Sequence, residues 1–327
     1  MQAVVTQTLS LEGSRLANFP IMFFAIPMGL FGTTLALHAA EKAYGLAGTY
    51  SETALYISGA VLLTIAALYL LKALFAGASV AHEWHHPIRI AFFPAASISL
   101  LLMATALTTD HPQTALWVWG IGTALQGTLA LAVIGSWIGH RSFQTGHLTP
   151  AWFIPAVGNV IVPIAGARLG YFEISWLFFS GGLMFWVILL TLVAQRLMFH
   201  DPLPGKMVPT LMILVAPPAV AFVAWLNLTG EVGPFGHILL SLGYVFAAIV
   251  ITQITKFRSI PFALSWWALS FPIAALTVAS FAYASDAGSA AHKTIGTVLL
   301  VVLMTAITGL VARTSLAILR KEICIAE

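Results

Sequence analysis

The sequence predicts an all-α integral membrane protein whose ten transmembrane helices form five helical hairpins. Of the 327 residues 60% are hydrophobic and only 8% are charged, whereas soluble proteins carry about 25% charged residues. Ten apolar stretches also reach the length of about 20 residues that a spanning helix needs, and prolines recur in every second stretch. The predicted spans are 19–40, 54–80, 88–109, 114–139, 150–169, 173–198, 207–229, 235–256, 262–285 and 292–319.

Prolines divide these ten stretches into two kinds. A proline inside a helix removes a backbone hydrogen bond and bends the helix, and in lipid the freed carbonyl must face protein or a wet cavity. We therefore expect the five odd-numbered helices to line a central pore in each protomer and the five even-numbered helices to wrap them. The prolines inside the odd stretches are, in order, Pro27, Pro94, Pro155 with Pro163, Pro217 with Pro218, and Pro272.

The hairpin is also the repeating unit of the chain. Its prolines recur about every 60 residues in the same orientation, which indicates parallel repeats rather than the inverted repeats of many secondary transporters. No linker or low-complexity run interrupts the series. We predict one transmembrane channel domain, 19–319, between a short cytoplasmic N-terminus, 1–18, and a short cytoplasmic C-terminus, 320–327.

The distribution of Lys and Arg predicts that both termini are cytoplasmic. Eleven of the 14 lie on the side of the termini and of the loops after even spans, and only Lys42, Arg168 and Lys293 lie on the other side. Cytoplasmic loops carry the excess of positive charge. The outer side holds six of the 11 acids, so we expect a basic inner face and an acidic outer face.

The kinked stretches contain no Asp or Glu. A buried acid is the usual mark of a proton relay or a cation site, so the sequence argues against a proton pump, a sodium-coupled carrier and a cation channel. An apolar path with basic ends suits anions, and the helix N-termini at the inner side favour them further. No motif indicates a cofactor or nucleic-acid binding, and the one match to a metal-binding pattern is weighed below. We predict a cytoplasmic mouth formed by Arg89, Lys256 and Arg258.

Residues 82–86 read His-Glu-Trp-His-His and match the zinc pattern H-E-x-x-H. In a metalloprotease the two histidines bind zinc and the glutamate is the general base, so a membrane zinc hydrolase using Glu83 is one alternative. However, Pro87 pushes His86 out of the α region, and a further carboxylate ligand is lacking on this side. We favour an interfacial turn in which Glu83 or a histidine pairs with Arg89.

Residues 265–272 read Ser-Trp-Trp-Ala-Leu-Ser-Phe-Pro. Phe271 directly precedes the proline of the ninth stretch, so a bend there would aim a large apolar ring at the axis. Such a ring across a narrow pore blocks ions by sterics and by dewetting. Packing between helices is the alternative role for this side chain.

Five motifs, taken in order, resemble the tellurite-resistance and dicarboxylate transporter family, which includes bacterial TehA proteins and the slow anion channels of plant guard cells. The resemblance covers residues from about 19 to 315. The motifs are Phe19-Pro20 with Ile-Pro-Met-Gly-Leu at 26–30, Glu-Trp-His-His-Pro-x-Arg at 83–89, Pro150 and Pro155 with Asn159, Phe-Phe-Ser-Gly-Gly at 178–182, and Trp-Ala-Leu-Ser-Phe-Pro at 267–272.

This resemblance implies a homotrimer with one pore through each protomer. It also implies that the phenylalanine of the ninth helix occludes the pore, and that residue matches Phe271. Ala25 stands where relatives often carry glycine, so its methyl group is expected to narrow the pore slightly. The predicted pore-lining residues are Phe24, Ala25, Pro27, Pro94, Pro155, Asn159, Pro217 and Pro272.

Together these features predict an anion channel of the bacterial inner membrane. It would pass small monovalent inorganic anions, nitrate before chloride, through a pore gated by Phe271 and surrounded by membrane lipid. The competing hypothesis is a carrier or exporter for tellurite, C4-dicarboxylates or other oxyanions, to which His38 near the outer end of the first span would contribute.

Overall fold

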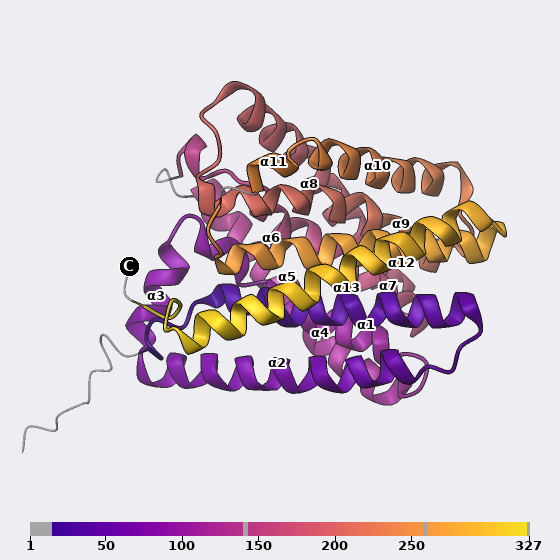
Figure 1. The fold of residues 1–327 in the computed structure, drawn as a ribbon, viewed down its shortest axis with the longest axis horizontal. Helices are drawn as coiled ribbons and strands as arrows, with labels where there is room; N and C mark the ends of the chain where they lie inside the picture. The colour runs from indigo at the N-terminus through magenta and orange to yellow at the C-terminus, as the bar shows by residue number, and fades with distance from the viewer. Residues whose placement is uncertain (1–14, 140–142, 258–259, 326–327) are drawn as a thin grey trace, which may run out of the picture.

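The computed structural model describes residues 15–139, 143–257 and 260–325, and these residues form a bundle of helices (Figure 1). Ten of its helical spans are long and apolar enough to cross a membrane, which confirms the predicted all-α, ten-span fold. They run Ile21–Tyr44, Thr49–Phe75, Arg89–Leu107, Pro112–Gly139, Pro150–Arg168, Phe172–Phe199, Gly205–Thr229, Gly233–Ile251, Leu264–Ala287 and Ala290–Leu319.

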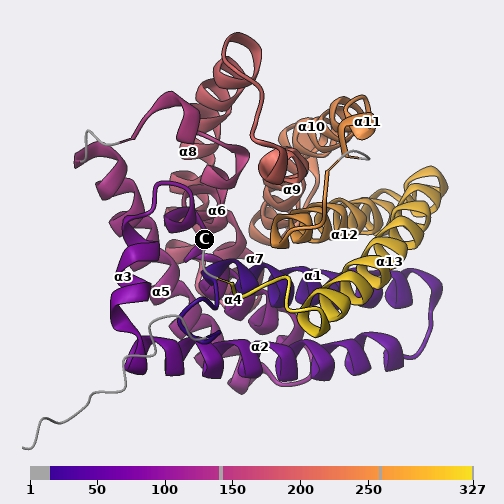
Figure 2. The ribbon, with the colours of Figure 1, turned by 60° about the vertical axis from the view of Figure 1, so that its left-hand side comes forward.

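Burial alternates along the chain as the prolines predicted. In the odd-numbered spans 72, 72, 94, 89 and 67% of the apolar window is buried inside the protein, against 17, 39, 28, 28 and 22% in the even-numbered spans. Five inner helices are therefore wrapped by five outer ones. Figure 2 shows one side of this arrangement, with α1 lying between α2 and the α12–α13 hairpin.

Each inner span begins as a 3-10 helix and continues as an α-helix. In a 3-10 helix the backbone bonds run from residue i to residue i+3 and the turn is tighter. In chain order the pieces are η1 (Ile21–Phe24) and α1 (Ala25–Tyr44); η2 (Arg89–Phe92) and α4 (Ala95–Leu107); η4 (Pro150–Trp152), α6 (Phe153–Val157), η5 (Gly158–Ile161) and α7 (Val162–Arg168); η6 (Gly205–Val215) and α9 (Ala216–Thr229); and η7 (Leu264–Leu269) and α12 (Ser270–Ala287).

The prolines lie where the 3-10 piece gives way to the α-helix. Pro27 and Pro272 are the third residues of α1 and α12, and Pro94 directly precedes α4. The first backbone N–H groups of an α-helix have no partner within that helix, so a proline there removes a hydrogen bond that the helix does not make. The prolines thus mark the junctions at little energetic cost.

The outer spans are continuous α-helices with prolines only in the first turn. Their bounds are α2 (Thr49–Phe75), α5 (Pro112–Gly139), α8 (Phe172–Phe199), α10 (Gly233–Ile251) and α13 (Ala290–Leu319). The shorter pieces α3 (Gly77–His85), η3 (Thr145–His147) and α11 (Ile254–Phe257) lie in loops at the end of the bundle where the C-terminus lies (Figure 1).

Side chains of the outer helix α5 bond carbonyl oxygens of the broken inner helices. The fully buried amide of Gln126 donates to the carbonyl oxygen of Pro155 at 3.1 Å and accepts from the hydroxyl of Ser97 at 2.7 Å. The Trp119 indole donates to the carbonyl oxygen of Val162 at 3.0 Å. Protein groups thus satisfy backbone oxygens that lipid would leave without partners.

Two local predictions were wrong. The helices extend beyond the apolar stretches, so α1 includes Glu41 and α12 includes Asp286 in their last turns; a helix can continue into the interface once its apolar band ends. The segment 82–86 is not a turn, because α3 continues to His85. His86 is extended, with φ −77° and ψ 124°, as the following proline requires.

Candidate functional site

A narrow cavity lies where the five inner spans meet. Its volume is about 50 Å³. Each inner span contributes to its wall, for example Ala25, Ile98, Val157, Pro217 and Phe271. Among the described residues Ser265 is the one polar side chain in this wall, and its hydroxyl donates to the backbone oxygen of Lys206. The inner helices therefore share one axis, and that axis has an apolar lining.

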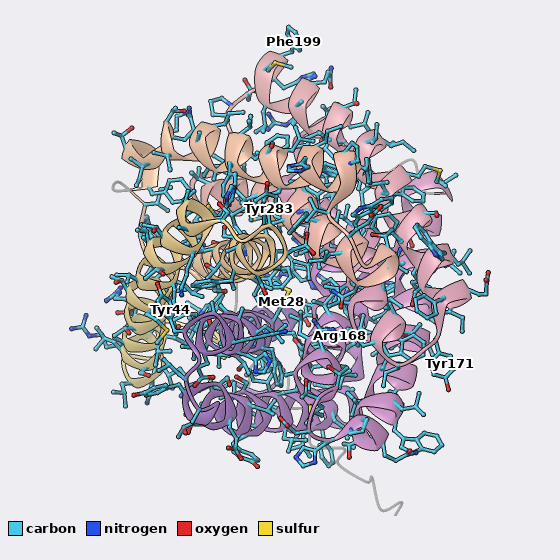
Figure 3. All side chains as sticks on the ribbon, turned by 90° about the vertical axis from the view of Figure 1, so that its right-hand side faces the viewer. Met28, Tyr44, Arg168, Tyr171, Phe199 and Tyr283 are labelled. Carbon is cyan, nitrogen blue, oxygen red and sulfur yellow. The ribbon has the colours of Figure 1, made fainter. Side chains whose placement is uncertain are left out.

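A wide vestibule adjoins the narrow cavity. Its volume is about 650 Å³, and it lies toward the end of the bundle opposite the C-terminus. Figure 3 is an end-on view from that side, in which Met28 and Arg168 lie near the middle of the helices, whereas Tyr171 and Phe199 lie at the periphery. The wall of the wide vestibule, unlike that of the narrow cavity, includes charged side chains, namely Lys42, Arg168 and Asp286.

Phe271 lies at the boundary between these two spaces. It lines both the narrow cavity and the wide vestibule, as does Val220, and it is 8% exposed. A large apolar ring therefore borders both spaces where they adjoin.

Two glycines of α1 leave room for the segment that carries Phe271 to pack closely against this helix. A Cβ built on Gly32 would come within 3.1 Å of the Phe271 ring, and one built on Gly29 would lie 2.7 Å from the Cβ of Ser270. On the other side, the buried Trp267 donates its indole N–H to the hydroxyl of Thr314 at 2.9 Å. The segment that carries the ring is thus held between α1 and α13.

The structure brings together four of the predicted pore residues. Phe271, Ala25, Pro217 and Pro272 line the narrow cavity. Two others point elsewhere: the Phe24 ring packs edge-on against Tyr69 of α2 at 5.7 Å, and the Asn159 amide oxygen accepts a hydrogen bond from Gln126 at 3.2 Å. Neither of these two lines either cavity, and the same is true of Pro27, Pro94 and Pro155.

The predicted cytoplasmic mouth is only partly described. Arg89 is the first residue of η2, and its backbone N–H donates to the His86 imidazole at 3.3 Å. Lys256 lies in the short helix α11. Neither lines the narrow cavity or the wide vestibule, and Arg258 lies outside the described residues.

Glu83 is part of a buried ion pair with Lys72 rather than with Arg89. Of the two predicted partners of Arg89, Glu83 was wrong, whereas a histidine does contact it, because the His86 imidazole accepts the backbone N–H of Arg89. Oε2 of Glu83 lies 2.7 Å from Lys72 Nζ and accepts the Tyr69 hydroxyl at 3.0 Å, while its Oε1 accepts the backbone N–H of Ile21 at 3.1 Å. Lys72 also donates to the carbonyl oxygen of Phe19 at 2.9 Å. With both oxygens engaged, Glu83 is placed to anchor η1 rather than to activate water.

Sequence reasoning missed the charged wall of the wide vestibule. Arg168 was assigned to the edge of a span, yet its guanidinium donates to Asn227 at 2.7 Å and approaches Thr108 at 3.5 Å. Lys42 and Asp286 lie just beyond the predicted spans 19–40 and 262–285. Their position could have revealed them: all three lie in the last turn of an inner span, where that span leaves the apolar band.

Comparison with known proteins identifies the family to which this chain belongs. The family described as "Voltage-dependent anion channel" matches residues 18–315. This chain belongs to that family. It is 30% identical to the S-type anion channel SLAH3 of Arabidopsis thaliana over 83% of this chain and 44% of the relative. It is 27% identical to the tellurite resistance protein TehA homolog of Haemophilus influenzae over 81% of each.

The guard cell S-type anion channel SLAC1 of Arabidopsis thaliana is similar as well, with 23% identity over 82% of this chain and 50% of the relative. The chain thus spans about half the length of these plant relatives. The shared part coincides with the ten-span bundle, since the family match begins just before η1 and ends within α13.

Proposed function

We propose that the protein is a channel for small monovalent anions in a bacterial inner membrane and that Phe271 closes it. The observation that carries this proposal is the position of Phe271 between two cavities on one axis. Membership of an anion-channel family supports it, as does the similarity to the S-type anion channels of Arabidopsis thaliana.

The apolar wall of the narrow cavity supports selection by dehydration. No ionisable side chain among the described residues lines this cavity, so an ion passing through it sheds water without gaining a fixed charge. Large, weakly hydrated anions lose the least hydration free energy on entering such a space. We therefore propose that nitrate permeates better than chloride.

The orientation and assembly are part of the same proposal. The excess of Lys and Arg at the end that carries the termini supports a cytoplasmic location for that end, and the wide vestibule then opens outward. The weakly buried, apolar outer helices suit contact with lipid and with neighbouring subunits, and the family resemblance supports a homotrimer.

The test is anion flux through the Phe271→Ala variant in liposomes. Removing the ring leaves open space because the surroundings relax only partly, so we expect anion flux to rise at least about tenfold. Phe222→Ala is the matched control: this ring is fully buried in α9 and lines neither cavity, and its loss should leave flux at the wild-type level. Unchanged flux in Phe271→Ala, or cation flux, would contradict the proposal.

A carrier for oxyanions is the competing proposal. The name of the TehA homolog and the ionisable wall of the wide vestibule, with Asp286 and His38, favour it. A carrier shows saturation and counterflow of a preloaded substrate, whereas a channel does not. Counterflow of tellurite or a C4-dicarboxylate in liposomes would decide for the carrier.

A further inference from the structure

The wide vestibule gathers positive charge at an end of the molecule that is otherwise acidic. The sequence places three cations and six acids at this end. Two of those cations, Lys42 and Arg168, line the vestibule, but of the acids only Asp286 does so. Glu41, next to Lys42, is buried and turned away: its carboxylate accepts the backbone N–H groups of Tyr50 and Ser51 at the start of α2, the shorter contact being 2.7 Å.

Arg168 is fixed in place by neutral partners. Its Nε donates to the amide oxygen of Asn227 in α9 at 2.7 Å, and its Nη1 approaches the hydroxyl of Thr108 at 3.5 Å. Within the described part of the chain, Nη2 has no protein partner at hydrogen-bond distance. Among the described residues no carboxylate bonds the guanidinium, and its Nη2 amino group remains available on the wall of the wide vestibule.

We propose that the wide vestibule contains an anion-binding site centred on Arg168, with Lys42 as a second positive charge, and that planar oxyanions such as nitrate occupy it before they reach Phe271. This inference rests on the proposed channel function for its role, because the site would supply anions to the gate. The binding itself needs only the vestibule.

The chemistry of the site favours an oxyanion over a halide. With Nε bonded to Asn227, one N–H of each Nη amino group can still meet two oxygens of one planar anion, whereas an ammonium offers a point charge. Because Asn227 and Thr108 already orient the group, binding does not require Arg168 to lose further side-chain freedom. Asp286 faces the same space and keeps the site from binding so tightly that anions fail to leave.

The direct test is nitrate binding to purified protein, followed as a rise in thermal unfolding temperature, with ionic strength held constant by a bulky organic anion. Arg168→Gln should raise the half-saturating nitrate concentration at least fivefold, and Arg168→Lys should raise it less. Lys293→Gln is the matched control: it removes a charge at the same end, but this ammonium lies 4.0 Å above the Tyr44 ring and outside the vestibule wall. We expect wild-type binding from it.

Equal nitrate binding by the wild type and Arg168→Gln would overturn the site, and so would an equal loss in Lys293→Gln. If Arg168→Gln does not fold, Lys42→Gln should raise the half-saturating concentration two- to threefold, and unchanged binding in both Lys42→Gln and Arg168→Lys would overturn it. The two proposals fail separately. If Phe271→Ala carries no anion flux while nitrate binding depends on Arg168, the proposed channel is wrong and the proposed binding site stands. If Phe271→Ala carries anion flux while nitrate binding does not depend on Arg168, the channel stands and the binding site is wrong.

Discussion

The two cavities on either side of Phe271 differ in size and in chemistry. The narrow cavity, of about 50 Å³, is apolar, whereas the wide vestibule, of about 650 Å³, has Lys42, Arg168 and Asp286 in its wall. An apolar constriction discriminates by the cost of dehydration, and a charged, wet vestibule attracts ions without stripping them. In the channel proposed above, recruitment and selection of anions would therefore occur at separate places along one axis.

The charged side chains at the two ends of the helix bundle differ in the partners that they bind. At the end near the termini, Lys72 and Glu83 are both almost fully buried and form an ion pair. At the vestibule end, Arg168 is bonded to neutral groups. The first pair is therefore expected to stabilise the fold, and the second group to act on ions.

Breaking the buried pair should have the largest effect. Lys72→Met leaves the Glu83 carboxylate buried without its partner and removes the bond to Phe19, and losing one member of such a pair costs about 3–5 kcal/mol. We expect that loss in the free energy of unfolding, measured by denaturant titration in detergent. The control is Lys206→Met, at an exposed lysine, which should lower the free energy of unfolding by less than about 0.5 kcal/mol. Similar losses in the two variants would contradict a stabilising role for the buried pair.

A negative charge should act far more strongly in the narrow cavity than in the wide vestibule. In the Phe271→Ala background, Ala268→Asp puts a carboxylate in the apolar wall and should lower anion current at least about a hundredfold, because repulsion is strong where water is scarce. Ala282→Asp, in the vestibule wall, should lower it only about threefold, because water and salt screen it. Ala268 and Ala282 line the two spaces respectively.

Ala268→Asn tests whether size rather than charge explains that result, because it is nearly isosteric with the aspartate and should keep most of the current. Bilayer recordings at equal protein density give the comparison. Equal losses in Ala268→Asp and Ala282→Asp would show that the two spaces do not differ as their linings indicate.

The contact between α1 and the segment carrying Phe271 should give a smaller effect. Gly29→Ala would press on Ser270, whose Cβ lies 2.7 Å from the added methyl group, and overpacking of this kind costs about 1–3 kcal/mol. Ser270→Gly in the same chain should recover most of that loss in unfolding free energy. The control is Gly59→Ala in α2, where an added Cβ meets nothing within 4 Å; a similar cost there, or no recovery in the double variant, would contradict close packing at this contact.

The alternation of inner and outer helices could be predicted from the sequence because its cause is local. Prolines such as Pro27 and Pro272 act on the backbone within one turn, and lipid forces the resulting breaks into the protein interior. The same reasoning predicted that Pro87 would push His86 out of the helix. The ends of the spans were less predictable, since Glu41 and Asp286 lie on helix that continues past the apolar band.

Side-chain directions and distant partners could not be predicted in this way. A 3-10 helix has 3.0 residues per turn and an α-helix 3.6, so the face that Phe24 or Ala25 presents depends on where one changes into the other. The pairing of Glu83 with Lys72 depends on how α3 packs against α2, and the bond between Arg168 and Asn227 joins two inner spans 59 residues apart. A pattern within one stretch carries no information about such contacts.

The most direct test of the account is an ion-substitution recording on the Phe271→Ala variant in a planar bilayer. With nitrate on one side and chloride on the other, we predict a current much larger than that of the wild type, carried by anions, with a reversal potential that shows nitrate as the more permeant ion. A current no larger than that of the wild type, a cation current, or chloride as the more permeant ion would contradict the account.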